Sequence, residues 1–462
     1  MRVLLISSNQ TRSLIPVPPI GIAYLASAVK ARGHDFRVVD LCFSVDPEMD
    51  LSRELAAFQP DLIGISVRNF AFNKMRKSEL MLAREMAVIC RDLRPGAEVI
   101  LGGAGFSYDP SGCLRYCGLQ YGIVGDGEIA LLAVLDRMAD GVEIGDVPGV
   151  VEAVDNGPSS CAPVDDLDAY PLTDIGFYDK AYLGWAMARS PYPSMKVFNI
   201  QTRRGCPNRC LNCKVSDYAG SRLRRKSPRL VVEELDLLHN TWGADRFFLV
   251  DDLFNQDLEH LASLCGALVR MKWSPRWSCI TCNNFENITP DVLGLMKEAG
   301  CEAVILDSTT AADRMLQVVG KTFTSEDLTK AAEAVAAAGL SPFFHLTIGF
   351  PGETAETARE SLRIMERLGA RTLPVILGTA VYPGTRLDML TAGQRIPCAN
   401  PGTPDLYISP DLDPAELGHM LWEYRQRHPD WFFGSVFSAA QDWINENLYG
   451  GAYGTGKSLL LP

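Results

Sequence analysis

The chain has 462 residues, of which 47% are hydrophobic and 22% charged, a composition typical of a globular enzyme with two or three domains. Its formal net charge of −12 argues against a nucleic-acid partner and would suit a cationic small substrate. No apolar run is long enough for a membrane span and no signal-peptide pattern is visible, so we expect a cytoplasmic protein without a membrane partner. The thirteen cysteines, an odd number in a long chain, do not indicate a disulfide framework.

Residues 1–140 alternate strand and helix signals. Continuous apolar strands separated by helices predict a parallel, doubly wound, Rossmann-like α/β sheet whose ligands bind at the carboxyl ends of the strands. One of these ends carries Gly102 and Gly103, and a glycine pair allows a flat ligand to approach the backbone closely. The strand candidates are 3–7, 36–39, 62–67, 99–101 and 121–124.

Two further segments and a tail follow. A Pro-, Gly- and Asp-rich stretch at 141–194 predicts a linker, and residues 195–395 carry a second series of strand and helix signals. Six strand–helix units predict a partial (β/α)6 TIM-type barrel with its site at the carboxyl ends of the strands. Residues 396–462 predict a small, mainly helical C-terminal region. The strand candidates of the barrel are 195–202, 246–252, 276–281, 302–308, 343–350 and 372–382.

Three cysteines, Cys206, Cys210 and Cys213, lie in the loop after the first strand of the barrel series, with the spacing C-x3-C-x2-C. Zinc is one alternative, but it requires four ligands, and the next histidine and cysteine, His239 and Cys265, are unpaired in sequence. Three thiolates on a four-iron cluster leave one iron free to bind a small chelating molecule. The spacing therefore favours a [4Fe–4S] cluster.

This cysteine loop resembles that of the radical S-adenosylmethionine (SAM) superfamily. The stretches GGAGFSYDP and YGIVGDGE resemble the N-terminal cobalamin (B12)-binding domain of one branch of that superfamily. The resemblance implies that SAM chelates the fourth iron and is cleaved to a 5′-deoxyadenosyl radical after an external carrier of flavodoxin or ferredoxin type supplies one electron. Cobalamin itself is left open, because the D-x-H-x-x-G pattern that supplies a histidine to cobalt in other corrinoid proteins is absent. If cobalamin binds, we expect Arg68 nearest the cobalt.

Further cofactor contacts are implied by the same resemblance. The stretch ILDSTT is similar to the superfamily's Gly-Ile-Glu-Ser stretch, with Asp307 in the place of the glutamate and Ser308 in the place of the serine. An acid at this place can accept hydrogen bonds from the ribose hydroxyls of SAM. Asn212 takes the place of an aromatic residue that often packs near the adenine.

Four residues are candidates for acid–base chemistry. Asp251 and Asp252 end the second barrel strand, and Tyr218 follows the cysteine loop. His345 lies on an apolar strand, where a hydrogen-bonded core histidine is the alternative interpretation.

These features predict a radical SAM enzyme that abstracts hydrogen from a hydroxylated or aminated small molecule. The acidic balance and the resemblance to the paromamine dehydratases of antibiotic biosynthesis favour an aminosugar substrate and dehydration, a lyase activity. A cobalamin-dependent C-methyltransferase of secondary metabolism is the alternative. An iron–sulfur electron-transfer protein without enzymatic activity is a third, which the glycine and acidic motifs beyond the cluster disfavour.

Overall fold

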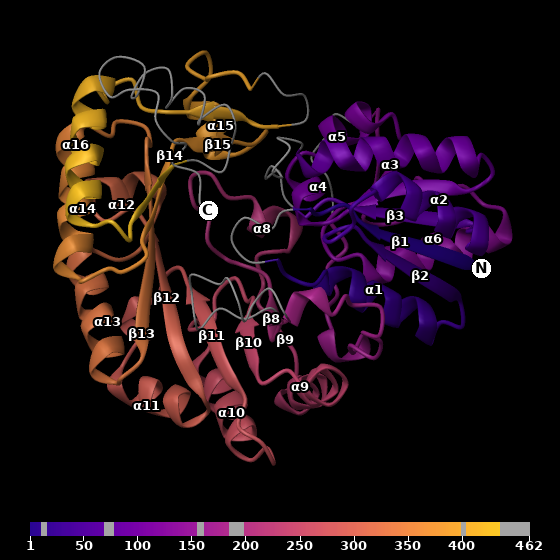
Figure 1. Ribbon diagram of the computed structural model, residues 1–462, viewed down its shortest axis with the longest axis horizontal. Helices are drawn as coiled ribbons and strands as arrows, with labels where there is room; N and C mark the ends of the chain where they lie inside the picture. The colour runs from indigo at the N-terminus through magenta and orange to yellow at the C-terminus, as the bar shows by residue number, and fades with distance from the viewer. Residues whose placement is uncertain (11–15, 69–77, 155–160, 184–197, 399–402, 435–462) are drawn as a thin grey trace.

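The computed structural model describes residues 1–10, 16–68, 78–154, 161–183, 198–398 and 403–434. They form two α/β domains side by side, with the N-terminal domain next to the barrel elements α8, β8 and β9 (Figure 1). None of the helices in these ranges is both long and apolar enough to cross a membrane.

The N-terminal domain is built on a six-stranded sheet with the order β2-β1-β3-β4-β5-β6. All neighbouring strands are parallel except β5 and β6, which pair antiparallel. The predicted linker therefore contributes an edge strand, β6, to this domain. The strands are β1 (Arg2–Ser7), β2 (Asp35–Asp40), β3 (Leu62–Ser66), β4 (Glu98–Gly102), β5 (Tyr121–Ile123) and β6 (Val150–Glu152).

Helices cover both faces of this sheet, so successive strand residues enter two separate cores. In β1, Leu4 and Ile6 belong to one hydrophobic cluster, whereas Val3 and Leu5 belong to another. A strand that is buried on both faces reads as a continuous apolar run, which explains why the pattern was visible in the sequence. The helices are α1 (Ile20–Ala31), α2 (Pro47–Phe58), α3 (Glu79–Leu93), α4 (Ala104–Tyr108), α5 (Pro110–Cys117) and α6 (Glu128–Asp140).

The second domain is an open barrel-like sheet of seven parallel strands, in the order β7-β10-β11-β12-β13-β14-β17. The six predicted strands are joined by β17, which comes from the C-terminal region. The strands are β7 (Phe198–Ile200), β10 (Arg246–Leu249), β11 (Arg276–Thr281), β12 (Cys301–Thr309), β13 (Ser341–Ile348), β14 (Pro374–Leu377) and β17 (Phe432–Gly434).

Shorter elements complete the domain. A pair of two-residue strands flanks the cysteine loop, a second small sheet joins β15 to β16, and the amphipathic pattern of the C-terminal region forms α16. The short strands are β8 (Arg203–Arg204), β9 (Arg224–Arg225), β15 (Thr379–Val381) and β16 (Asp405–Tyr407). The helices are α8 (Val215–Tyr218), α9 (Pro228–Trp242), α10 (Leu258–Val269), α11 (Pro290–Glu298), α12 (Asp313–Val319), α13 (Ser325–Ala337), α14 (Ala355–Arg367), α15 (Arg386–Leu390) and α16 (Pro414–Arg427).

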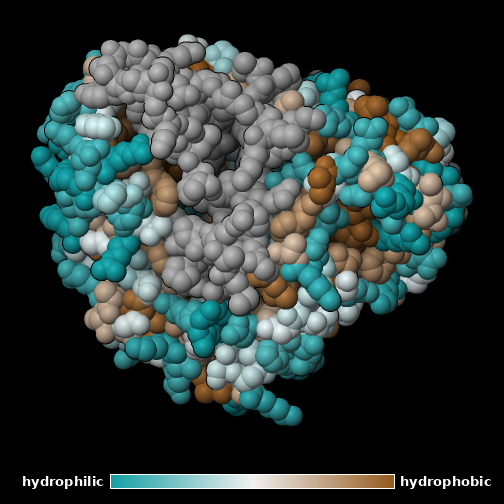
Figure 2. Space-filling model, in the orientation of Figure 1, coloured by the Kyte–Doolittle hydropathy of each residue, from teal (hydrophilic) through white to brown (hydrophobic). Residues whose placement is uncertain are grey.

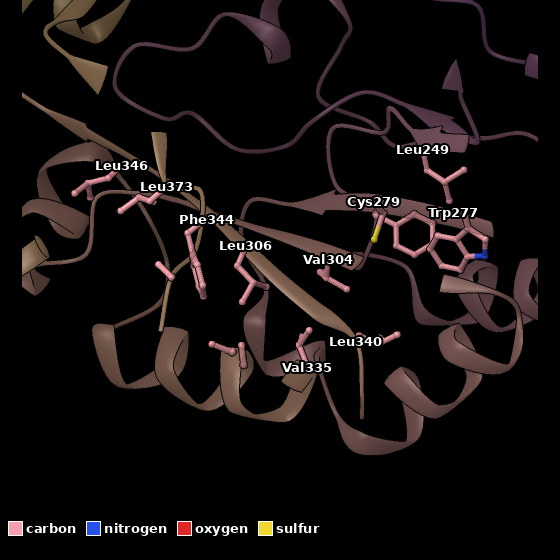
Figure 3. Packing of buried hydrophobic residues seen from close by; sticks show 14 of the residues in the cluster. Leu249, Trp277, Cys279, Val304, Leu306, Val335, Leu340, Phe344, Leu346 and Leu373 are labelled. Carbon is pink, nitrogen blue, oxygen red and sulfur yellow. The ribbon is translucent and has the colours of Figure 1, made fainter. Parts of the chain in front are cut away.

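The core of the barrel lies between its strands and its outer helices (Figure 3). Outward-facing strand residues such as Val304, Leu306 and Phe344 pack in the same cluster as Val335 of α13. The helical outer side is predominantly hydrophilic on the face shown in Figure 2. Since side chains alternate across a strand, the residues between these outward-facing positions point into the barrel.

Candidate functional site

The cysteine loop is held in place by backbone contacts to three other segments. The β8–β9 pair closes its base, and Cys206 N donates to Gly220 O over 3.0 Å. At its far end Leu211 N donates to Val319 O and Leu211 O accepts from Leu387 N, both over 2.9 Å. Leu211 is fully buried in a small hydrophobic cluster that is separate from the main core of the barrel. The residue after Cys210 therefore anchors the loop on the barrel.

The three thiols all belong to this loop, and none of them forms a disulfide. Burial raises the pKa of Cys206 to about 12, and Asp252, Cys213 and Cys210 add to that shift. Burial also raises the pKa of Cys213. Thiolates in this setting require a nearby cation, which an iron–sulfur cluster provides.

A single metal ion does not fit the same residues. Within the described ranges no three His, Cys, Asp or Glu side chains converge closely enough to hold one ion. The zinc alternative therefore finds no support, whereas a four-iron cluster is larger and needs its three thiolates further apart.

Lys321 brings a positive charge to this loop. Its ammonium donates to the carbonyl oxygens of Cys282 (3.0 Å) and Asp307 (2.9 Å). Burial opposes its charge, but Asp307, Cys282 and two cluster cysteines outweigh burial and raise the pKa of Lys321. Lys321 lies two residues after Val319, whose carbonyl oxygen accepts from Leu211 N of the cysteine loop. Its positive charge therefore interacts with the thiols of Cys210 and Cys213.

Asp307 and His345 form a pair on neighbouring strands, with Nδ1 of His345 3.1 Å from Oδ1 of Asp307. Asp307 also accepts from Thr309 Oγ1 over 3.1 Å and from Cys282 Sγ over 3.5 Å. Burial opposes its ionisation, but His345 and Lys321 outweigh burial and lower the pKa of Asp307. Asp307 is therefore held as a carboxylate.

The other two residues implied by the resemblance lie elsewhere. Ser308 points to the opposite side of β12 from Asp307 and is fully buried, and its Oγ has no hydrogen-bond partner in the structure. Asn212 is half-buried in the cysteine loop. Like Asp307, neither of them lines the cavity described below.

Asp251 and Asp252, adjacent in sequence, occupy different environments. Asp251 is fully buried and accepts from Thr202 N (2.7 Å), Thr202 Oγ1 and Arg203 N (3.0 Å). It thereby ties the end of β10 to the strand that precedes the cysteines. Asp252 lines the cavity, and burial, together with Asp251 and Asp126, raises its pKa to about 7.

Buried ion pairs connect the two domains directly before the cysteines. Arg204 donates to both carboxylate oxygens of Glu128, over 2.7 and 3.1 Å, and lies 3.3 Å from Asp126. Arg224, on the partner strand β9, contacts the second oxygen of Asp126. The stretch GDGE carries both acidic residues. Glu128 and Asp126 lie 76 and 98 residues before the arginines that they bind, so no local sequence pattern indicates these pairs.

Aromatic residues add a second contact between the domains. Tyr108 of α4 has its hydroxyl 4.0 Å from Cys213 Sγ, and its ring lies 5.5 Å from that of Tyr218 and 4.3 Å from that of Tyr382. Gly125 has φ +78°, and a side chain there would collide with the carbonyl oxygen of Tyr218. The N-terminal domain thus packs tightly on the helix that follows the cluster loop.

A cavity of about 690 Å³ lies between the domains. Its N-terminal wall contains Arg68 and six glycines, so a flat ligand can approach the backbone there. At Gly103, which has φ +100°, an added Cβ would lie 2.5 Å from Val67 O. The exposed glycine backbone makes this wall flat enough to fit a corrin. An added Cβ would meet no atom within 4 Å at Gly21, whereas at Gly103 and Gly125 it would collide with backbone oxygens. The six glycines are Gly21, Gly64, Gly102, Gly103, Gly125 and Gly127.

The opposite wall of the cavity comes from the barrel. It contributes Tyr218, Asp252 and, from β13, His345. The cavity therefore gathers three of the four predicted acid–base residues, with Arg68 and the glycine pair facing them from the other domain. Asp251 is the exception, because its carboxylate is used inside the fold.

Two family models match the chain, one in each domain. Residues 12–135 match the family described as the B12 binding domain, and residues 200–365 match the radical SAM superfamily.

Two curated relatives illustrate the likeness in sequence. The chain is 27% identical over 380 residues to an uncharacterized methyltransferase of Pyrococcus horikoshii, covering 80% of this chain and 77% of that protein. It is 26% identical over 445 residues to tryptophan 2-C-methyltransferase of Streptomyces laurentii, covering 82% and 73%.

A solved structure shares the fold along nearly the whole chain. This is the radical SAM methyltransferase TsrM of Kitasatospora setae with cobalamin and a [4Fe–4S] cluster bound, with a TM-score of 0.79 at 22% identity and coverage of 98% and 99%.

Proposed function

Because the chain combines a B12-binding domain with a radical SAM domain, we propose that it is a cobalamin-dependent radical SAM C-methyltransferase acting on a small molecule. The observation that carries this proposal is the single cavity lined by both domains. Its glycine wall belongs to the B12-binding domain, and its opposite wall includes Tyr218 of the helix after the cysteine loop. A corrin and an activated substrate carbon would then share one cavity, as direct methyl transfer requires.

The chain's own residues have separable roles in this proposal. Cys206, Cys210 and Cys213 would hold the cluster, and Arg68, just after β3, would lie on the corrin side of the cavity. Bound together, the cofactors would supply one-electron cleavage of SAM and a transferable methyl group. An external one-electron carrier would deliver the reducing equivalent. Asp307, whose pKa is lowered by His345 and Lys321, would accept a hydrogen bond from a donor such as a ribose hydroxyl.

Asp252 is the best placed proton acceptor. It lines the cavity, and its pKa of about 7 lets it take up or release a proton under physiological conditions. His345 shares the cavity but already contacts Asp307, so we assign it to positioning. Tyr218 lines the cavity, and its ring packs on that of Tyr108.

Methyl transfer is better supported than the dehydration predicted from the sequence. The matched relatives named above are methyltransferases, and none of them is named a dehydratase.

The test follows the methyl group of SAM. Reconstituted protein is supplied with hydroxocobalamin, a one-electron reductant, SAM labelled at its methyl group, and a mixture of aromatic and aminosugar acceptors. We expect label in a small-molecule product, and none with the Cys210→Ser variant. Turnover of SAM that leaves all label on methionine, with loss of water from an acceptor, would favour dehydration instead.

A further inference from the structure

The inside of the barrel is open and apolar. Phe248, Val250, Ile305, Phe343 and Pro374 line the cavity from strands β10 to β14 or directly after them, and all five are half-buried. In a TIM barrel the inward-facing side chains normally fill the interior as a packed core. Here they retain accessible surface, because the cavity continues between them.

The outward-facing neighbours show the contrast. Phe247, Leu249, Val304 and Leu306 are each no more than 2% exposed. The partial exposure therefore belongs to one face of the strands, the face toward the cavity, and is not a general looseness of the sheet.

Charges in the cavity are mostly neutralised by other protein groups. Of its carboxylates, Asp126 and Glu128 are bound to Arg204 and Arg224. Asp252 is the remaining one on the lining, and two arginines, Arg68 and Arg204, line the same cavity. A polycationic aminosugar would need several carboxylates to replace its hydration. Among the described lining residues, Asp252 is the one carboxylate that no arginine neutralises.

One buried acceptor on the cavity wall lacks a hydrogen-bond donor. The Oδ1 atom of Asn199 is buried and has no hydrogen-bond partner in the structure, and Asn199 lines the cavity. Asn199 lies on β7, directly opposite Phe248 on β10. Both residues line the cavity, so the amide and the aromatic ring are cross-strand neighbours on the cavity side. A buried acceptor without a partner costs free energy that a ligand N–H or O–H would recover.

We propose that the methyl acceptor is an uncharged aromatic or similarly flat apolar molecule that carries an N–H or O–H donor. Its ring packs against Phe248 and Phe343, and its donor binds Asn199 Oδ1. Aromatic rings bury a large apolar area with few internal rotations, which suits a wall of this composition. This inference rests on the proposed function in taking the cavity as the acceptor site, and it replaces the aminosugar expected from the net charge.

Three probes separate the terms of the proposal. Indole has a flat apolar ring and one N–H donor, 1-methylindole lacks the donor, and glucosamine is a cationic sugar. Equilibrium dialysis under anaerobic conditions with the reconstituted full chain measures the affinity of each. We expect indole to bind roughly three- to tenfold more tightly than 1-methylindole, the range for one buried hydrogen bond, and glucosamine to bind more weakly than both.

Variants assign the effect to residues. Asn199→Ala should abolish the preference for indole over 1-methylindole, and Phe343→Ala should weaken both probes. Phe343→Leu keeps an apolar wall and should weaken them less. Phe58→Ala is the matched control, because Phe58 lies on α2 under the Arg37 guanidinium, away from the cavity lining, and should leave all affinities unchanged.

Several outcomes would overturn the proposal. They are a tighter affinity for glucosamine than for indole, no preference for indole over 1-methylindole, a preference that survives Asn199→Ala, and no binding of either indole up to its solubility limit. None of these results bears on corrin retention or on transfer of labelled methyl. Failure of the substrate class is therefore distinguishable from failure of the proposed function.

Discussion

Replacing Arg204 with methionine would leave Glu128 buried without its cation at the contact between the two domains. The side chains are 13% and 4% exposed, so solvent screening is small. Removing one partner of a buried ion pair costs about 3–5 kcal/mol, and we expect the apo protein to lose that much stability. The double variant Arg204→Met, Glu128→Leu should recover part of the loss, with a coupling energy of about 2 kcal/mol.

The assay is urea unfolding of the wild type, both single variants and the double variant, followed by circular dichroism. Burial alone would raise the pKa of Glu128, but Arg204 outweighs burial and lowers it. The contribution of the pair is therefore present above the ordinary glutamate range and is lost as pH falls through the lowered pKa. A coupling energy below about 0.5 kcal/mol at neutral pH would refute the idea that this pair fastens the domains.

Three further predictions test single residues. The pKa of Asp252 is raised to about 7, so the stability of the apo protein should fall as pH rises from about 4 to about 7. Asp252→Asn should flatten this pH dependence in urea unfolding, and an unchanged slope would contradict the assignment. Lys321→Met removes a positive charge and should lower the midpoint potential of the cluster in a redox titration followed by electron paramagnetic resonance, whereas Lys321→Arg should leave it unchanged. Equal potentials in the wild type and Lys321→Met would show that the charge does not reach the cluster. Gly125→Ala should cost roughly 1–3 kcal/mol because a Cβ there meets the Tyr218 carbonyl, whereas Gly141→Ala, also at positive φ but with nothing within 4 Å, should cost less; equal losses in thermal unfolding would contradict the packing.

The architecture was readable from the sequence because its signals are local. Doubly buried strands give continuous apolar runs, and caps mark helix starts. For example, α9 begins directly after Ser227, whose side chain caps it by accepting from Leu230 N. β6 and β17 were missed because they are short and lie in segments whose composition predicted a linker and a mainly helical tail, and each pairs with a strand that lies elsewhere in the sequence.

The site could be predicted only where a motif encodes it. The cysteine spacing located the cluster loop, and Asp252 was found from its place at a strand end. The sequence could not separate Asp252 from Asp251, because adjacent residues on a strand point to opposite sides and only the fold shows which side is the cavity. The partners of Arg204, the position of Lys321 and the open barrel interior all depend on long-range packing.

The central claim, that both domains line one site for a corrin, is tested most directly by cobalamin stoichiometry in the wild type and in Gly21→Phe. Gly21 lines the cavity, and a Cβ there would meet nothing within 4 Å, so this is the position of the glycine wall at which a side chain can be added without an immediate clash. After reconstitution with iron, sulfide and hydroxocobalamin, we predict one corrin per wild-type chain and loss of the corrin from Gly21→Phe at unchanged iron content. A wild type that retains no corrin, or a variant that binds it equally well, would contradict the account.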